Sequence, residues 1–257
     1  MRDKVAIITG GSSGIGKETA KRLADRGTKT VLLARDMAKL DAARNEFKDR
    51  TRVTAVQADV TDRNSLKSAV AQVVAAHGSI DIVVNCAGSG YFGPVVEMTE
   101  EAITKLVRTN VFGPVLMVQE SLEALKRSRG TIVNISSGLS KRALPYLSVY
   151  GGTKAMQDQI SDGLRMELRD TGIRVLSYGP PATDTPFLDV SAPDTRSRMS
   201  SFVKLAKPQD VAARIVKAIE GDKREVNEGG FLKAMNFFAP GVLDTLFYKW
   251  MVRKPKT

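Results

Sequence analysis

The sequence predicts an α/β fold in which helices cover both faces of an open, doubly wound parallel sheet. Short apolar runs alternate with helical segments from Lys4 onward, the pattern of repeated strand–helix–strand units. Glycine, asparagine and serine motifs follow the ends of these strands. Parallel strands end at one edge of a sheet and ligands bind there, so the motifs should meet in one site. Residues 1–257 are expected to form a single domain.

The first unit is a strand, a glycine turn and a helix. Lys4–Thr9 is apolar enough for a buried strand, and a helix is expected from Gly14 to Arg26, where Gly27 stops it. A glycine turn at a helix N-terminus brings backbone N–H groups against phosphate. Its spacing differs from G-x-G-x-x-G, so it is weak evidence alone. The candidate phosphate-binding residues are Gly10, Ser12, Ser13, Gly14, Ile15 and Gly16.

The next expected strand, Thr30–Ala34, ends at Arg35. In such a sheet the adenosine ribose of a dinucleotide lies beside that end. An acidic residue there would bind the 2′-hydroxyl of NAD, whereas arginine suits a 2′-phosphate in charge and in bidentate geometry. Since Arg35 stands at this strand end and the first acid after the strand is Asp36, the sequence favours NADP(H) as the cofactor. The alternative is that Arg35 only begins the next helix.

The third strand, Val53–Gln57, leads to the pair Asp59 and Val60. A carboxylate at a strand end can accept a hydrogen bond from an adenine amino group, so this pair is a candidate adenine contact. Asp62 is expected instead to cap the following helix, residues 63–76.

Two further motifs lie in the middle of the chain. The strand Ile80–Val84 runs into the candidate ribose contacts Asn85, Ala87 and Gly88, which are small enough to leave room for a ligand. A long helix is expected over residues 100–126, with Asn110 and a Gly-Pro pair inside it. Both contradict helix propensity. Such a contradiction marks a functional position or a simple break between two helices.

The candidate proton-transfer groups follow the fifth strand. Ser136 and Ser137 come first, and the next helix carries Tyr150 and Lys154, four residues apart on one face. An ammonium beside a phenol favours the phenolate, so we expect a lowered tyrosine pKa. Such a tyrosine can exchange a proton with a carbonyl or alcohol oxygen that a serine holds. Taken alone, a Tyr-x-x-x-Lys pair is more often a surface pair.

The composition narrows the function classes. The net charge of +11 indicates attraction to a phosphorylated cofactor or an acidic lipid surface, or only a well-solvated surface. Nucleic-acid binding is disfavoured because aromatic residues are only 6% and lie away from long basic runs. The single cysteine, Cys86, predicts a reducing compartment, and no signal peptide or membrane span is recognised. A cytoplasmic location is therefore expected, and no metal site is predicted.

In this order and spacing, the motifs resemble the short-chain dehydrogenase/reductase family from about residue 4 to residue 220. The resemblance implies a Rossmann fold, hydride transfer with NAD(P), and a homodimer or homotetramer built through long helices. It rests on T-G-G-S-S-G-I-G at residues 9–16, N-C-A-G at 85–88, Asn110, Ser137 and Y-G-G-T-K at 150–154.

The resemblance also implies residue roles. Tyr150 would be the general acid of reduction, and Lys154 would lower its pKa and bind the nicotinamide ribose. Ser137 would hold the substrate oxygen, and Asn110 would position a water of the proton relay. The residues implied in cofactor contacts are Gly10, Ser12–Gly16, Asp59, Val60, Asn85, Ala87, Gly88, Tyr150, Lys154, Gly179 and Thr183.

Some residues depart from the family pattern. Cys86 stands where a second asparagine is usual, and the family's Pro-Gly after the sixth strand becomes Tyr178-Gly-Pro-Pro. Thr183 still stands where a threonine contacts the carboxamide. Gly151 and Gly152 follow the tyrosine at a cost of up to ~1 kcal/mol each in helix propensity, for which close helix packing is the expected reason.

Substrate specificity is expected from residues 184–206, an apolar lid, and from residues 229–257, an apolar extension with a basic end. The extension is interpreted as an interfacial helix on anionic lipid, or as a helix packed on its own domain or on a second subunit. The segment 178–186 is also similar to that of 3-ketodihydrosphingosine reductases. The apolar residues of the lid are Phe187, Leu188, Met199, Phe202, Val203 and Leu205.

The expected function is NADP(H)-dependent reduction of an apolar ketone to a secondary alcohol, or the reverse, with a long-chain 3-keto lipid as candidate substrate. Reductases of 3-oxoacyl thioesters and hydroxysteroids share these features and stay open as alternatives. An NADPH-binding sensor or a lipid-surface scaffold also stays open. The presence of both Tyr150 and Lys154 disfavours the sensor. A peripheral location at a membrane surface would accompany a lipid role.

Overall fold

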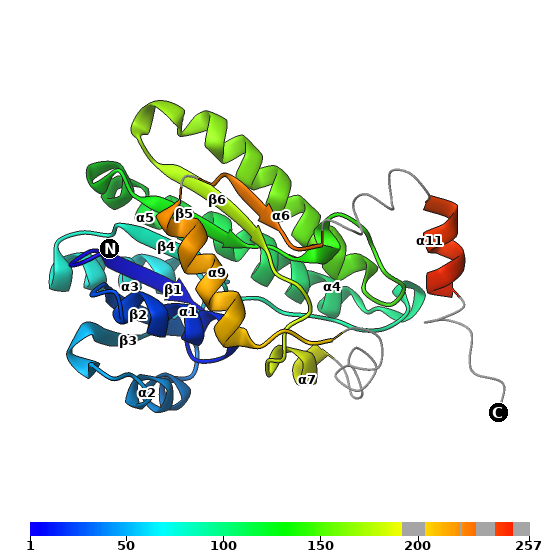
Figure 1. Ribbon diagram of the computed structural model, residues 1–257, viewed down its shortest axis with the longest axis horizontal. Coiled ribbons are helices and arrows are strands. Elements are labelled where there is room, and N and C mark those ends of the chain that lie inside the picture. The colour runs from blue at the N-terminus through cyan, green and yellow to red at the C-terminus, as the bar shows by residue number, and fades with distance from the viewer. Residues whose placement is uncertain (192–203, 222, 230–239, 249–257) are drawn as a thin grey trace.

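Seven strands form one parallel sheet in the order β3-β2-β1-β4-β5-β6-β7 (Figure 1). The computed structural model describes residues 1–191, 204–221, 223–229 and 240–248. All strand pairs are parallel, as the sequence predicts. The strands are β1 (Val5–Thr9), β2 (Lys29–Ala34), β3 (Val53–Gln57), β4 (Ile82–Asn85), β5 (Thr131–Ile135), β6 (Arg174–Gly179) and β7 (Glu225–Asn227).

Helices cover both faces of this sheet, so the predicted doubly wound α/β fold is confirmed. On one face lie α1 (Gly14–Ala24), α2 (Met37–Asn45) and α9 (Pro208–Glu220). On the other lie α3 (Arg63–His77), α5 (Gly113–Ser128) and α6 (Ser148–Glu167). Adjacent strand residues face opposite layers: Ile7 packs with α3 and α5, and Ile8 packs with α1 and α9. Both are fully buried, which contributes about 2 kcal/mol each.

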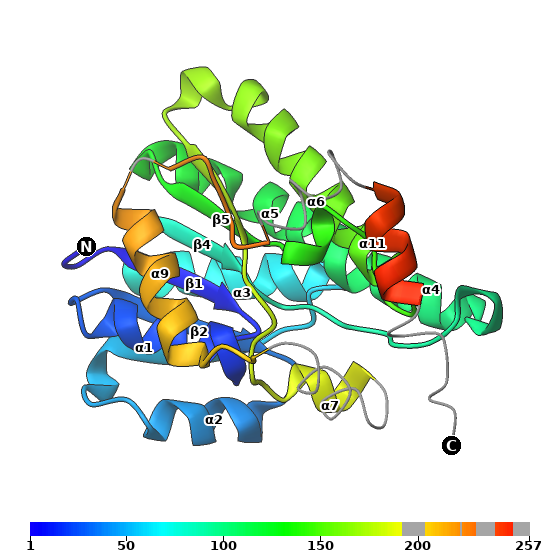
Figure 2. The same ribbon diagram turned by 45° about the vertical axis from the view of Figure 1, so that its right-hand side comes forward.

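Shorter elements lie at the margins of the sheet. Figure 1 and Figure 2 show α11 near α4 and α6, apart from the strands. An ion pair between Arg142 and Asp244 connects it to the loop after β5. The short elements are α4 (Glu100–Val107), α7 (Phe187–Ser191), α11 (Pro240–Phe247), and 3-10 turns at Arg50–Arg52, Val95–Glu97, Gly138–Ser140 and Arg169–Thr171.

Aspartate caps set two of the helix boundaries. Asp62 accepts a hydrogen bond from Asn64 N at 2.9 Å, which confirms its predicted role as a cap. Helix α2 ends at Asn45. Asp49 caps the following 3-10 turn by accepting from Thr51 N at 3.0 Å.

The long helix expected around Asn110 is continuous but irregular. After α4, a π-helical turn at Arg108–Phe112 leads directly into α5. The wider turn accommodates Pro114, which stands at the start of α5 and has no N–H to donate. The Gly-Pro pair therefore marks neither a regular helix nor a break. Turns of this kind accompany functional sites, and the fully buried Asn110 lies inside this one.

Much of the predicted lid and extension lies outside the described residues. The lid is described at 184–191 and 204–206, so Met199, Phe202 and Val203 are not covered. The extension is described only at residue 229 and at 240–248.

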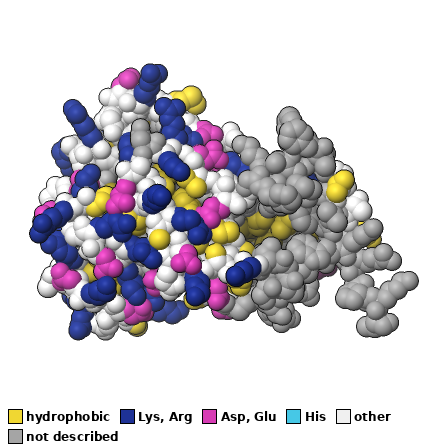
Figure 3. Space-filling model, viewed as in Figure 1, with side chains coloured by type: hydrophobic (Ala, Val, Ile, Leu, Met, Phe, Trp, Pro, Cys, Tyr) yellow, Lys and Arg dark blue, Asp and Glu magenta, His cyan; other side chains and the backbone are white. Residues whose placement is uncertain are grey.

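The excess positive charge is spread over the surface. Figure 3 shows Lys and Arg side chains over the face that α1 and α9 form, with Asp and Glu side chains among them. Several are paired, as in Lys17–Glu46 and Arg26–Glu220, both at 2.6 Å. No helix in the described parts of the chain is long and apolar enough to span a bilayer. Across the same residues, His, Cys, Asp and Glu form no group of three that could hold a metal ion.

Candidate active site

The predicted motifs meet where β1, β4 and β5 end. Thr9 joins the first two strand ends, because its Oγ1 accepts from the backbone N–H groups of Cys86 and Ala87, both at 3.0 Å. Gly10 has φ of 67°, and a Cβ there would lie 3.0 Å from Ala87 Cα. A side chain at Gly10 would therefore separate the two strand ends. The sequence offered no reason to single out Thr9.

The glycine turn has the geometry of a phosphate cradle. A Cβ at Gly16 would lie 2.4 Å from the carbonyl oxygen of Gly10, so only glycine allows this close turn. Helix α1 begins at Gly14, and its N-cap residue Ser13 makes no side-chain hydrogen bond to the first turn. Helix N-termini of this kind present backbone N–H groups to phosphate. The turn thus fits the pyrophosphate of a dinucleotide.

The adenosine side of the cradle is built by the ends of β2 and β3. Helix α2 begins at Met37, after Asp36, so Arg35 does not begin the helix. The Asp36 carboxylate caps α2 by accepting from Lys39 N at 3.0 Å. Gln57 Nε2 donates to the carbonyl oxygen of Arg35 at 2.8 Å and fixes its backbone. Of the two charged residues at this strand end, Asp36 is engaged as a helix cap and Arg35 is not.

Asp59 and Val60 lie at the adjoining strand end. Asp59 Oδ1 accepts from the N–H and the hydroxyl of Thr61, both at 2.8 Å, so one carboxylate oxygen is already engaged. Val60 packs against Gly113, where a Cβ would lie 3.1 Å from a Val60 methyl. This contact joins the candidate adenine pair to the start of α5.

Ser137 and Tyr150 face each other across the end of β5. Burial raises the pKa of Tyr150 to about 12, although a hydrogen bond with Ser137 opposes the rise. The predicted lowering is therefore wrong for the protein without cofactor, because desolvation dominates. Ser136 is oriented differently: its hydroxyl donates to the carbonyl oxygen of Lys154 at 3.3 Å. Of the two serines, Ser137 is the one beside the phenol.

The Lys154 ammonium is buried and hydrogen-bonded to two neighbouring oxygens. Its Nζ donates to Ile135 O at 2.8 Å and to Gln157 Oε1 at 3.1 Å. Burial lowers the pKa of Lys154 to about 8. A Cβ on Gly88 would lie 3.9 Å from Nζ, so the ammonium also borders the loop after β4. Gln157 is a contact that sequence reasoning missed.

Asn110 joins two parts of the site through its side chain. Its Nδ2 donates to Ser89 O at 2.9 Å and to Thr153 Oγ1 at 3.0 Å, and its Oδ1 accepts from Ser89 N at 2.8 Å. Both amide donors are thereby used. The π-helical turn thus positions Asn110 to connect the loop after β4 with α6.

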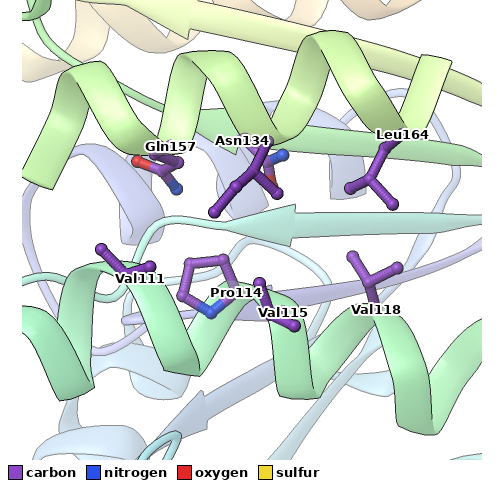
Figure 4. Close-up of a pocket in the computed structure, with 8 residues that line it drawn as sticks. Val111, Pro114, Val115, Val118, Asn134, Gln157 and Leu164 are labelled. Carbon is purple, nitrogen blue, oxygen red and sulfur yellow. The ribbon is translucent and has the colours of Figure 1, made fainter. Parts of the chain in front are cut away.

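A buried polar chain lies behind these groups. Asn85 Nδ2 donates to Asn134 Oδ1 at 2.8 Å, and Asn134 Nδ2 donates to Ser161 Oγ at 2.8 Å. Figure 4 shows Asn134 and Gln157 beside a small cavity between α5 and α6. Its volume of about 10 Å³ suits one water molecule and no substrate. A polar residue inside an apolar strand was the signal that could have identified Asn134.

The segment after β6 crosses from the glycine turn to the tyrosine. A Cβ on Gly14 would lie 3.1 Å from the side chain of Thr185, and the Phe187 ring lies 5.6 Å from that of Tyr150. Thr183, on the same segment, is buried, and its Oγ1 donates to Pro181 O at 2.7 Å. Residues 183–187 therefore border both halves of the site.

Comparison with known proteins identifies the family. The family model described as short chain dehydrogenase matches residues 4–196. The chain belongs to this family.

Relatives of this short-chain dehydrogenase cover most or all of its length. Dehydrogenase/reductase SDR family member 7B of Danio rerio is 29% identical, over 100% of this chain and 87% of its own. An uncharacterized oxidoreductase of Staphylococcus epidermidis is 31% identical, over 85% of this chain and 92% of its own.

Solved structures of short-chain dehydrogenases are also similar. A 3-ketoacyl-(acyl-carrier-protein) reductase from Brucella melitensis, complexed with NADH, has a TM-score of 0.77 and 29% identity, covering 85% of this chain and 91% of its own. An alcohol dehydrogenase from Thermococcus sibiricus, complexed with 5-hydroxy-NADP, has a TM-score of 0.78 and 28% identity. The match covers 88% of this chain and 97% of that protein.

Three glycines of this short-chain dehydrogenase differ in what an added side chain would meet. A Cβ on Gly151 would lie 3.2 Å from Leu139 O, so α6 packs closely on the loop after β5, as expected. Gly152 has no atom within 4 Å of such a Cβ, so close packing does not explain it. At Gly179, a Cβ would lie 2.6 Å from Asn227 Nδ2 and 3.0 Å from Ser137 O, so a larger residue would displace the Asn227 side chain.

Proposed function

We propose that this short-chain dehydrogenase reduces an apolar ketone to a secondary alcohol with NADP(H), or catalyses the reverse. The observation that carries the proposal is the grouping of Ser137 and Tyr150 at the end of β5 with the buried ammonium of Lys154. This group lies at the sheet edge where the glycine turn fits a dinucleotide. The similar structures complexed with NADH and with 5-hydroxy-NADP support a nicotinamide cofactor. NADPH consumption in the presence of ketones tests the proposal.

The residues divide the chemistry between them. A nicotinamide cofactor bound at the cradle would supply the hydride. Because its pKa is about 12, Tyr150 is protonated at neutral pH and can donate its proton to the substrate oxygen. The Ser137 hydroxyl holds that oxygen, and Lys154 supplies the positive charge that stabilises the phenolate left behind. Asn110 keeps the loop after β4 in place through Ser89.

The cofactor preference is proposed to be NADP(H), and Arg35 supports it. Asp36, the nearest acid in sequence, is engaged as the cap of α2. A guanidinium can bind a 2′-phosphate with two hydrogen bonds, whereas a free carboxylate at this place would have favoured NAD.

An apolar substrate is proposed because an aromatic ring lies against the tyrosine and a second aromatic pair joins the loops after β4 and β5. Phe187 contacts Tyr150, and the rings of Phe92 and Tyr146 lie 5.5 Å apart. The loops that carry the second pair are joined, since Gly93 N donates to Tyr146 O at 2.9 Å. Aromatic walls bury apolar groups effectively. A long-chain 3-ketone remains the candidate substrate, with 3-oxoacyl thioesters and ketosteroids as alternatives.

The lowered pKa of Lys154 leads to a pH prediction. A lysine whose pKa falls to about 8 loses its charge as the pH rises through that value. We therefore expect kcat/KM for ketone reduction to be level near pH 6 to 7 and to fall above about pH 8. Initial rates from pH 6 to pH 10 measure this. A profile that stays level to pH 10 would show that the ammonium charge is not required.

A lipid-surface contact through the extension is proposed to bring an apolar substrate to the site. Val242 and Tyr248 of the α11 region are 54% and 57% exposed, and the segment after residue 248 contains Lys249, Arg253 and Lys254. Exposed apolar and basic residues together favour anionic bilayers. The opposing possibility is an interface with a second subunit.

Deleting residues 240–257 separates these possibilities. We expect the shortened chain to bind anionic vesicles several-fold more weakly, because apolar and basic residues are both removed, while it still reduces a small water-soluble ketone. Vesicle co-sedimentation measures binding, and neutral phosphatidylcholine vesicles are the control. Unchanged vesicle binding, together with a smaller oligomer in gel filtration, would instead make the extension an interface. Vesicle binding without turnover by the full chain would favour the scaffold.

A further inference from the structure

The carboxylate of Asp158 lies behind the site and has no part in the mechanism above. It stands one helical turn after Lys154 on α6, and the residue is 6% exposed. Ser177 Oγ of β6 donates to its Oδ1 at 2.6 Å, and the Lys141 ammonium forms an ion pair with its Oδ2 at 3.0 Å. An unpaired charge at this depth would cost several kcal/mol. The surrounding residues are therefore arranged to keep a negative charge here.

Asp158 also reaches the turn that carries Ser137. Lys141, whose ammonium pairs with the carboxylate, directly follows the 3-10 turn Gly138–Ser140. Burial is the largest influence on the pKa of Asp158 and raises it, but the hydrogen bonds together hold the pKa below its ordinary value. The carboxylate is thus ionised at neutral pH and anchors the turn from α6. Ser140 Oγ in addition lies 2.8 Å from Ser137 O.

The same charge acts on the ammonium of Lys154. Burial lowers the pKa of Lys154, and the fields of Cys86 and Asp158 oppose that lowering. Burial also raises the pKa of the Cys86 thiol to about 11, so the thiol is neutral at pH 7. Of these two groups, Asp158 is the one that carries a negative charge at that pH.

We propose that Asp158 is a positioning residue of this site: through its ion pair with Lys141 the carboxylate anchors the turn that presents Ser137 to Tyr150, and it places a negative charge one helical turn from Lys154. In its catalytic consequence the proposal rests on the function proposed above. Removing only the charge makes Lys154 a weaker base, whereas removing the whole carboxylate also releases the turn.

Other charged groups around Asp158 come from neighbouring elements and stay in place in the test. Glu225 of β7 shares the Lys141 ammonium at 2.8 Å, so Lys141 keeps one partner when Asp158 is replaced. Arg165 lies further along α6, and the negative charges of Glu225 and Asp158 both oppose the lowering of its pKa by burial. Tyr150 and Lys154 are the titrating groups on the side of the substrate.

Two substitutions separate the two effects. Asp158→Asn keeps an oxygen acceptor for Ser177 and Lys141 but removes the charge, so kcat/KM should match the wild type at pH 6, and its alkaline fall should move to lower pH. Asp158→Ala also frees the turn, so kcat should fall about tenfold or more at every pH, because misplaced groups lose rate steeply. The matched control is Asp162→Asn, one turn further along α6, whose carboxylate pairs with Arg165 and is 51% exposed. It should leave the profile unchanged.

A second readout is independent of turnover. Lysine labelled with ¹³C at Cε is titrated by NMR in the full chain without cofactor, and the Lys154 signal is the one lost in Lys154→Met. We expect its midpoint to lie lower in Asp158→Asn than in the wild type, and to be unchanged in Asp162→Asn. Should Asp158→Asn unfold, the double variant with Lys141→Met removes the unpaired ammonium and is titrated instead.

The outcomes distinguish this proposal from the proposed function. An unmoved Lys154 midpoint, with a wild-type pH profile in Asp158→Asn and wild-type kcat in Asp158→Ala, overturns the role of Asp158 even if the chain reduces ketones. A shifted midpoint in a chain that consumes no NADPH supports the charge coupling and contradicts the proposed function instead.

Discussion

Replacing Tyr150 by phenylalanine is expected to lower kcat for ketone reduction about a thousandfold and to leave the Kd for NADPH within about twofold. The substitution removes only the hydroxyl that Ser137 contacts, and a positioned general acid contributes on the order of 10²–10⁴ in rate. The cradle residues are untouched, so cofactor binding should persist. Steady-state rates and fluorescence titration with NADPH measure the two quantities.

The control for this experiment is Tyr91→Phe. It makes the same chemical change on the loop after β4, at a residue to which no catalytic role is assigned, and it should retain most of the activity. If Tyr150→Phe kept more than about a tenth of wild-type kcat, Tyr150 would not be the proton donor. If it lost NADPH binding as well, the loss of activity would result from a disturbed cofactor site rather than from the loss of the proton donor.

Replacing Arg35 by aspartate is expected to lower the ratio of kcat/KM values for NADPH over NADH by about a hundredfold. A charge-assisted bidentate contact to a 2′-phosphate is lost and a repulsive carboxylate takes its place, and about 2.7 kcal/mol corresponds to such a factor. The same carboxylate can accept from the 2′-hydroxyl of NADH, so activity with NADH should be kept or improved. Paired rate measurements with the two cofactors give the ratio.

Arg44→Asp makes the same change of charge in the last turn of α2, away from the end of β2. We expect this control to leave the cofactor ratio within about threefold of wild type, because the charge there is exposed to solvent screening. An equal fall in both variants would mean that the ratio responds to net charge. No change in Arg35→Asp would show that Arg35 does not read the phosphate.

The sheet and the location of the site could be predicted because the motifs that follow the strands are short and contiguous in the sequence. The turn from Gly10 to Gly16 needs small residues at close approach, which the sequence shows directly. The alternation of strands and helices and the cap at Asp62 follow from equally local signals. The π-helical turn around Asn110 could not be predicted, because it depends on how α4 and α5 share one continuous axis.

The electrostatics of the site could not be predicted from spacing alone. Tyr150 and Lys154 share a helix face as expected, yet burial raises the pKa of one to about 12 and lowers that of the other to about 8. Desolvation depends on neighbours that are distant in sequence. One signal was present: Gln157, Asp158 and Ser161 continue the same polar face of a buried helix, and polar residues at such positions are there to be paired.

NADPH oxidation by the purified chain, measured against four ketones at fixed enzyme and cofactor, tests the central claim most directly. The panel is a long-chain 3-ketone amine, a 3-oxoacyl thioester, a ketosteroid and a simple aromatic ketone. We predict turnover, fastest with a long-chain apolar ketone, and its loss in Tyr150→Phe. Tight NADPH binding with no oxidation by any of the four would contradict the assignment as a ketone reductase and favour a cofactor-binding role without catalysis.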